Sequence, residues 1–283
     1  MVCPLLRRGR TGSHLHTDAM TCEQLLEGVV LPIDKPRQWT SFQTVNKIKA
    51  VVRNAYGLKK FKIGHAGTLD PLATGLLLVC IGKATKSIPQ LQDGDKEYSG
   101  TMVLGATTPC FDLEQAIDKY YPYTHITQAF VKAAAHKLTG AIMQTPPIFS
   151  AVKIDGQRAY EYARRDDQSA TIEPKQVVVH RFEISEFRPG SEAAVQVLAT
   201  TPHQADAHHL YDNPQGCVPP FLPQADFRIH CGKGTYIRSL ARDLGTELGS
   251  GAFLCALRRE RICNYHVDNA LQLDDVADYL ATS

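Results

Sequence analysis

Residues 64–82 read GHAGTLDPLATGLLLVCIG, and the first part of this stretch surrounds one carboxylate, Asp70, with glycines at 64, 67 and 75. Glycine allows backbone angles and close approaches that other residues resist. Pro71 favours an extended conformation at Asp70 and supplies no amide hydrogen. The stretch therefore predicts a tight loop that presents one acidic side chain, which an ordinary surface aspartate would not need.

The rest of this stretch and its neighbours predict a sheet. GLLLVCIG at 75–82 is short, apolar and bounded by glycines, which is typical of a buried strand. KEYSGTMVLG at 96–105 alternates, and GVVLPI at 28–33 is also strand-like. Thr40 or Ser41 can cap a helix that follows. The apolar positions expected for this helix are Phe42, Val45, Ile48 and Val52.

The second half of the chain continues the mixture of strands and helices. A helix is predicted from Thr127 to a glycine stop at 140. Residues 144–165 contain prolines, a DG turn and a short Tyr-rich helix with arginines. These features indicate an arm rather than a core segment. Further strands are expected at 177–187, 194–200 and 226–231.

Two more segments complete the pattern. The polar stretch 201–224 is long enough to be an insertion or a functional flap. GKGTYIRSLARDLGTELG at 232–249 predicts a helix whose apolar face is separate from Arg238 and Arg242. The expected class is α+β, with a largely antiparallel mixed sheet flanked by helices.

Length and composition indicate a globular chain. It has 283 residues, 43% hydrophobic and 21% charged, enough for a substantial core. Its longest uncharged apolar run is far below the roughly 20 residues that cross a bilayer. Residues 1–27 are expected to be a disordered extension before a catalytic domain at 28–283, with Met20 as an alternative start. An organelle-targeting segment is the rival interpretation.

Cysteine usage argues against a zinc site or a disulfide framework. The eight cysteines form no CxxC pair and fall on unrelated segments. Reduced thiols in a cytoplasm fit better. His203, His208, His209 and Cys217 lie in a loop without defensible ligand spacing, so neither a metal nor another cofactor is expected.

Positive charge is concentrated near the amino end of the patterned region. Net charge is only +2, yet eight basic residues and one acid lie between Leu31 and Ile63. This concentration is either a footprint for a phosphate backbone or a well-solvated lysine face on a helix.

The chemistry suggested by the residues centres on a single acid. The chain has neither a phosphate-binding loop with the required spacing nor a Ser-His-acid or Cys-His context. A lone carboxylate can act as nucleophile or base only when ionised, and a nearby arginine favours that state. Arg238 is the obvious candidate. The alternatives are that Asp70 caps a turn and that Arg238 is a surface charge.

Several motifs together resemble the TruB family of tRNA pseudouridine synthases. These motifs are GHAGTLDPLATGLLLVCIGKATK, DKEYSGTMVLG, CGKGTYIRSLARDLG and ALRRERI, in this order, preceded by LPIDKPRQWTSFQTVNKIK. The resemblance spans about residues 28–263. One departure is Gln38, which stands where the family usually has glycine in its DKPxGxTS segment.

The resemblance implies roles for individual residues in the reaction. Asp70 would attack the target nucleotide, and Arg238 would pair with it. Tyr98 would stack on the uracil and take part in proton transfer, while Leu257 would line the uracil pocket.

Other implied roles concern RNA binding. His65 would help to hold the RNA loop, and Lys35 would shape the floor of the active site. The arm, with Arg164 and Arg165, would grip phosphates.

The implied function is isomerisation of uridine to pseudouridine at position 55 in the T loop of tRNA, by a cytoplasmic enzyme that uses base flipping and no cofactor. The T arm of tRNA would be the partner of a monomer, without a guide RNA or a membrane. Only about 20 residues follow ALRRERI, so the family's C-terminal PUA domain is not expected. The alternatives are a guide-dependent synthase for ribosomal RNA and a non-catalytic tRNA chaperone.

Overall fold

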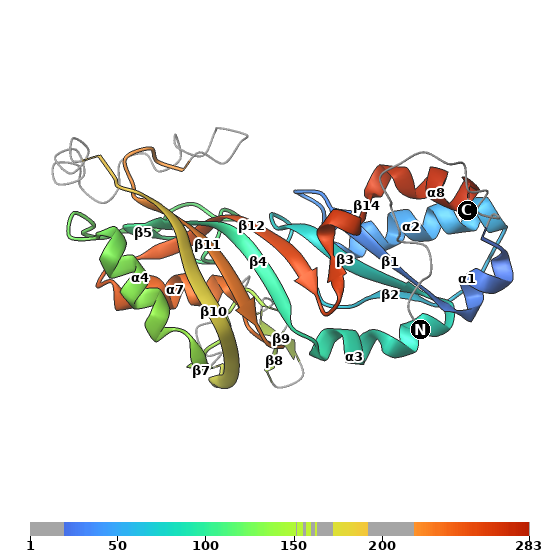
Figure 1. Ribbon diagram of the computed structural model, residues 1–283, viewed down its shortest axis with the longest axis horizontal. Coiled ribbons are helices and arrows are strands. Elements are labelled where there is room, and N and C mark those ends of the chain that lie inside the picture. Colours follow the sequence, from blue (N-terminus) through green and yellow to red (C-terminus); the bar gives the residue numbers. More distant parts are fainter. Residues whose placement is uncertain are drawn as a thin grey trace. The chain divides into compact units, whose positions relative to one another are not determined.

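The computed structural model describes residues 20–150, 152–154, 157–159, 162, 172–191 and 218–282. The chain divides into two compact units, Met1–Lys96 with Arg258–Ser283 and Glu97–Leu257. Figure 1 labels the helices and strands of both units. Within the described ranges, every helix is too short or too polar to span a bilayer.

The described residues of the first unit form the following elements or parts of elements. They are α1 (Cys22–Gly28), β1 (Val29–Lys35), α2 (Ser41–Tyr56), β2 (Ile63–His65), β3 (Thr74–Ile81), η1 (Gly82–Ser87), α3 (Ile88–Asp93), the end of β12 (Ala252–Ile262), β13 (Tyr265–His266), η3 (Val267–Asn269), β14 (Leu271–Gln272), η4 (Leu273–Asp275) and α8 (Val276–Thr282).

The sheet of this unit has the strand order β14-β1-β3-β12. β1 and β3 are antiparallel, from Val29 opposite Ile81 to Lys35 opposite Gly75. β14 lies parallel to β1, and β12 lies parallel to β3. Helices α2 and α8 lie side by side over this sheet (Figure 1). The register places Lys35 opposite Gly75, at the start of β3 where the Asp70 loop ends.

The expected helix after Thr40 is present, but its buried face differs from the prediction. Thr40 is the N-cap in a capping box with Gln43. The prediction that Phe42 belongs to the apolar face was wrong, because 71% of this residue is exposed. Ser41 and Thr44 occupy the buried positions instead.

The amino-terminal region also differs from the expectation. Disorder was expected through residue 27, but a second capping box, between Thr21 and Gln24, begins helix α1. Leu25 of this helix is completely buried in the core of the unit. Burial of apolar side chains therefore orders the chain before residue 28. The sequence of this short helix did not lead to that prediction.

The described residues of the second unit form a further set of elements. They are β4 (Lys96–Leu104), β5 (Ala106–Thr107), β6 (Lys119–Tyr120), α4 (Gln128–Lys137), β7 (Gly140–Gln144), β8 (Lys153–Ile154), β9 (Gln157–Arg158), β10 (Lys175–Arg188), β11 (Gln224–Cys231), α7 (Ile237–Glu247) and the start of β12.

The strands of the second unit follow the order β12-β4-β11-β10-β7. β10 is antiparallel to both β11 and β7, and α4 packs on β10 and α7 (Figure 1). The strands expected at 28–33, 75–82, 96–105, 177–187 and 226–231 are confirmed. So are the Thr127-capped helix and the α+β class. The strand expected at 194–200 and most of the loop at 201–224 lie outside the described residues.

Candidate active site

The loop between β2 and β3 carries Asp70, which is half-buried. The N–H of Ala73 donates to the Asp70 carbonyl across 3.2 Å, which closes a turn around Pro71. Gly67 adopts a φ of +91°, a backbone angle that residues with a side chain rarely adopt. Gly75, at φ +100°, ends the loop where a Cβ atom would lie 2.4 Å from the Arg259 carbonyl oxygen. Two of the three predicted glycines are therefore required by backbone angle, and Gly75 also by close approach.

A buried arginine holds the first half of this loop. Arg259 donates from Nε to the Leu76 carbonyl (2.8 Å), from Nη2 to Gly67 (3.0 Å) and from Nη1 to Thr68 (3.3 Å). The planar guanidinium suits this task because its donors have a fixed geometry. Arg259 thus fixes the backbone on both sides of the loop.

A buried serine holds the next part of the loop. Ser41 Oγ donates to the Leu69 carbonyl at 3.0 Å and accepts from the Leu69 N–H at 2.8 Å. Ser41 is the first residue of α2, so the helix places its hydroxyl directly against the residue before Asp70.

Lys35 holds the loop beyond Asp70. Its buried ammonium donates to the carbonyls of Pro36 (2.9 Å), Trp39 (2.6 Å) and Pro71 (3.3 Å). Burial lowers the pKa of Lys35 to about 8; the Asp70 charge opposes this shift and the Arg259 charge adds to it. This position fits the expected role in the site floor, which stays a prediction.

His65 ends β2 and leads into the Asp70 loop. Burial lowers its pKa, the Arg259 charge lowers it further, and the Gly67 backbone opposes the shift. Within the described ranges, no hydrogen bond reaches its buried Nδ1 atom. The neutral form of the imidazole is therefore favoured. The role of His65 in holding the RNA loop stays a prediction.

Gln38 stands where the resemblance leads to the expectation of glycine, and it adopts a conformation that glycine favours. Its φ is +66°, the left-handed region that glycine favours. Its N–H donates to the Pro71 carbonyl at 2.8 Å, so the turn between β1 and α2 is tied to the Asp70 loop. This backbone conformation is energetically less favourable for glutamine than for glycine.

Arg238 lies in the second unit, at the start of α7, and is buried. It donates to the carbonyls of Cys110 (3.2 Å) and Phe149 (2.9 Å), and its Nε lies 3.7 Å from Asp112 Oδ2. It is therefore not a surface charge. Asp70 belongs to the first unit, so the pair of Asp70 with Arg238 stays a prediction.

Tyr98 and Leu257 also belong to the second unit. Tyr98 is in β4 and Leu257 in β12, and both are half-buried against the apolar core of that unit. Each therefore has a supported side chain that is partly accessible. Their expected contacts with uracil stay predictions.

The base of the arm is attached to the start of α7. Ser239 Oγ and Arg242 Nη2 donate to the Thr145 carbonyl at 2.8 and 3.0 Å. Gln144 exchanges two hydrogen bonds with the backbone of Tyr236. Strands β8 and β9 pair on the two sides of the expected DG turn, whose own residues lie outside the described ones. Arg164 and Arg165 lie outside the described residues.

Two residues that position the Asp70 loop, Ser41 and Arg259, were not predicted from the sequence. Arg259 stands in the ALRRERI motif, two residues after Leu257, and a pair of arginines within an apolar strand could have indicated it. Ser41 was considered only as a helix cap. Both contacts join segments far apart in the sequence, which local patterns do not reveal.

Sequence comparison finds close relatives over most of the chain. The tRNA pseudouridine synthase B of Flavobacterium johnsoniae is 48% identical over 255 residues, covering 90% of this chain and 96% of that protein. Its counterpart in Phocaeicola vulgatus is 42% identical over 254 residues, covering 90% and 94%. That of Thermobifida fusca is 41% identical over 253 residues, covering 89% and 75%.

Structural comparison agrees with the sequence comparison. A chain in the crystal structure of a Cbf5-Nop10-Gar1 complex matches with a TM-score of 0.59 and 25% identity, covering 91% of this chain and 59% of that one. A family model described as TruB family pseudouridylate synthase (N terminal domain) matches residues 53–202. This chain therefore belongs to the TruB family of pseudouridylate synthases.

Proposed function

We propose that this protein is an isomerase that converts uridine to pseudouridine in tRNA, with Asp70 as its nucleophile. In the net reaction the N1–C1′ bond breaks, the base turns, and C5 bonds to C1′. The C5 proton is lost and N1 gains a proton, so atoms and electrons balance without a redox partner. One correctly placed carboxylate can serve such a reaction.

The observation that carries this proposal is the construction of the Asp70 loop. Arg259, Ser41 and Lys35 each bind backbone groups of the loop, from Gly67 to Pro71. A nucleophile that is held in place does not have to be ordered during the reaction. The relatives named tRNA pseudouridine synthase B support tRNA as the substrate.

The remaining residues are proposed to support the flipped base. Tyr98 would stack on the uracil and move a proton, Leu257 would line its pocket, and Arg238 would keep Asp70 ionised. The burial of Arg238 supports this, because a buried guanidinium acts on a carboxylate more strongly than an exposed one. His65, which precedes the Asp70 loop, would hold the RNA loop, and Lys35, which binds the Pro71 carbonyl, would form the site floor.

The finer substrate assignment is position 55 in the T loop of tRNA, bound by a monomer. The basic stretch between Lys35 and Lys62 and the arginines Arg164 and Arg165 would contact phosphates, which supply much of the affinity for RNA. The proposed compartment is the cytoplasm, where thiols stay reduced.

Asp70→Asn tests the proposal. The variant keeps the size and hydrogen bonding of the side chain but removes its negative charge. We expect it to bind a T-arm stem-loop transcript with nearly wild-type affinity while releasing no tritium from C5-labelled uridine. Asp274→Asn, which neutralises an exposed carboxylate of the same unit, is the matched control and should release tritium normally. Release by Asp70→Asn at the wild-type rate would refute the assignment.

The same assay separates the alternative functions. Purified protein incubated with unmodified tRNA and no other component should form pseudouridine, which a guide-dependent enzyme would not do. A tRNA chaperone without catalytic activity would bind the transcript. In that case even the wild-type protein would release no tritium.

A further inference from the structure

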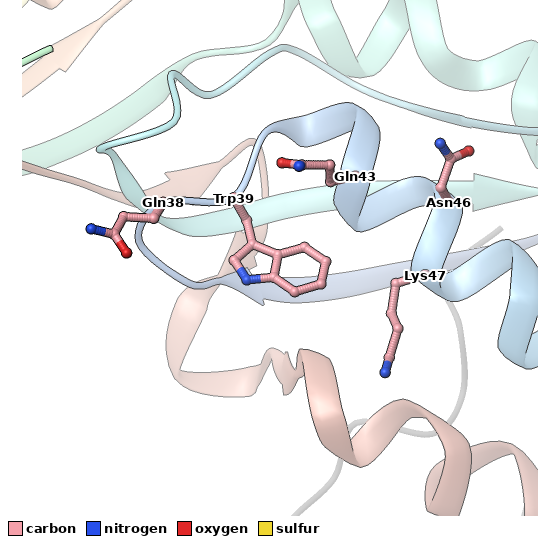
Figure 2. A pocket seen from close by; sticks show the side chains of 5 residues that line it. All are labelled: Gln38, Trp39, Gln43, Asn46 and Lys47. Atoms are coloured by element: carbon pink, nitrogen blue, oxygen red, sulfur yellow. The ribbon is translucent and has the colours of Figure 1, made fainter.

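A pocket of about 380 Å³ lies beside the amino-terminal end of α2 in the first unit. This volume falls in the range of roughly 300–1,000 Å³ that is common for ligand sites. Figure 2 shows the Trp39 indole and the Lys47 side chain extending in the same direction from the turn and the helix. The lining residues are Gln38, Trp39, Gln43, Asn46 and Lys47.

Trp39 gives the pocket an aromatic wall. The residue is half-buried and packs against the apolar core of the unit, so the core holds the side chain in position. The backbone carbonyl of Trp39 accepts from the Lys35 ammonium at 2.6 Å, which also holds this residue in place. Bases of single-stranded RNA stack on such aromatic side chains irrespective of sequence.

The other walls carry groups that match a nucleotide. Gln43 Oε1 already accepts from Thr40 in the capping box, so the glutamine is fixed and its amide N–H groups remain as donors. Asn46 and Lys47 are exposed one helical turn further along α2. An amide can bind the edge of a base, and an ammonium can bind a phosphate.

The pocket is joined rigidly to the Asp70 loop. The Gln38 N–H donates to the Pro71 carbonyl at 2.8 Å, and the Lys35 ammonium bridges the carbonyls of Trp39 and Pro71. A ligand against Trp39 would therefore be held at a fixed distance from the loop that presents Asp70.

We propose that this pocket binds one unpaired nucleotide of the substrate RNA, other than the target uridine, with its base on Trp39 and a phosphate at Lys47. The inference rests on the proposed function for its source of RNA. The excess of basic residues between Leu31 and Ile63 favours a polyanion over an apolar or cationic ligand. The bound nucleotide would position the RNA relative to Asp70.

Trp39 is the only tryptophan in the chain, so its fluorescence reports on this pocket alone. The full-length Asp70→Asn protein is titrated with a T-arm stem-loop transcript, and emission and acrylamide quenching are recorded. We expect the RNA to quench the emission and to protect the indole from acrylamide with the same midpoint as filter binding. Unchanged emission and acrylamide access at saturating RNA would overturn the proposal.

Abasic substitution identifies the nucleotide. Each unpaired position of the transcript is replaced in turn by an abasic ribose, and one replacement should abolish the quenching. If every abasic transcript quenches fully, no base stacks on Trp39 and the proposal is wrong. Uridine 5′-monophosphate is titrated separately, and saturation by it at concentrations where the transcript has no effect would assign the pocket to free nucleotides instead.

A pair of variants separates stacking from a structural role of Trp39. Trp39→Leu keeps an apolar contact with the core, and we expect about tenfold weaker binding of the intact transcript but unchanged binding of the identified abasic transcript. Trp39→Phe retains a ring and should restore most of the difference. Equal weakening of both transcripts by Trp39→Leu would show a structural effect only and would contradict the proposal.

Lys47→Ala and Lys49→Ala remove the same charge from the same helix, but only Lys47 lines the pocket. Lys47→Ala should reduce the protection of Trp39 from acrylamide, whereas Lys49→Ala should leave it unchanged. Wild-type tritium release is measured in parallel. Release without any Trp39 response would refute this inference alone, and a Trp39 response without release would refute the proposed function alone.

Discussion

Ser41 and Leu69 are joined by a reciprocal pair of hydrogen bonds, with the serine hydroxyl donating to the Leu69 carbonyl and accepting from the Leu69 N–H. The two residues are 28 positions apart in the sequence. The hydroxyl thereby takes the place of a neighbouring strand and satisfies both backbone groups of the residue before Asp70. A single small side chain thus connects α2 to the Asp70 loop.

Ser41→Ala should destabilise the protein by about 1–3 kcal/mol, because it leaves buried backbone groups of Leu69 without this partner. A shift of the loop should also lower kcat by roughly tenfold to a hundredfold. Urea unfolding and tritium release measure the two effects. Thr246→Ala removes a hydroxyl that bonds backbone at an exposed site and should change stability by less than about 0.5 kcal/mol. Equal effects of the two substitutions would contradict the role of Ser41.

Gln38→Gly should stabilise the protein by about 1 kcal/mol, because φ +66° is costly for a glutamine and not for a glycine. For a chain of this size, the expected rise in Tm is roughly 2–4 °C. Arg37→Gly is the matched control, since Arg37 is not among the described residues with positive φ, and it should lower Tm. A lower Tm for Gln38→Gly would show that the turn is not strained.

The buried Lys35 should make stability depend on pH. Its pKa is about 8 in the folded protein and 10.5 as an ordinary lysine, so between these values the unfolded chain binds more protons. The free energy of unfolding contributed by Lys35 therefore rises as pH rises through this window. Lys35→Met removes this dependence together with hydrogen bonds to three carbonyls. The difference in unfolding free energy between wild type and Lys35→Met should be larger at pH 10 than at pH 7.5, and a constant difference would argue against a lowered pKa.

Arg238→Ala should weaken both the fold and catalysis. It leaves the carbonyls of Cys110 and Phe149 without this donor and removes a cation near Asp112, at a cost of a few kcal/mol. Arg228→Ala removes an exposed arginine from β11 of the same unit and should be nearly neutral. Thermal unfolding and tritium release are compared for the two variants. Unchanged turnover by Arg238→Ala would remove it from the catalytic machinery.

Local signals in the sequence were sufficient for the elements around Asp70. Glycines, a proline and a short apolar run specify the loop and β3 because each acts on the backbone within a few residues. Thr40 was identified as a possible cap for the same reason, and its capping box with Gln43 involves only the first turn of α2. The catalytic assignment of Asp70 came from motifs in register rather than from these local rules.

Only the tertiary structure determined the contacts that hold the Asp70 loop. Arg259 bonds to Gly67, 192 positions away, and Ser41 bonds to Leu69, so neither partner could be read from neighbouring residues. Phe42 shows the same limit, because helical periodicity gives a face but not which polar residues will be buried on it. A buried polar side chain needs hydrogen-bond partners that the folded chain supplies. The order of residues in the sequence does not show which distant carbonyl groups will lie next to it and need a donor.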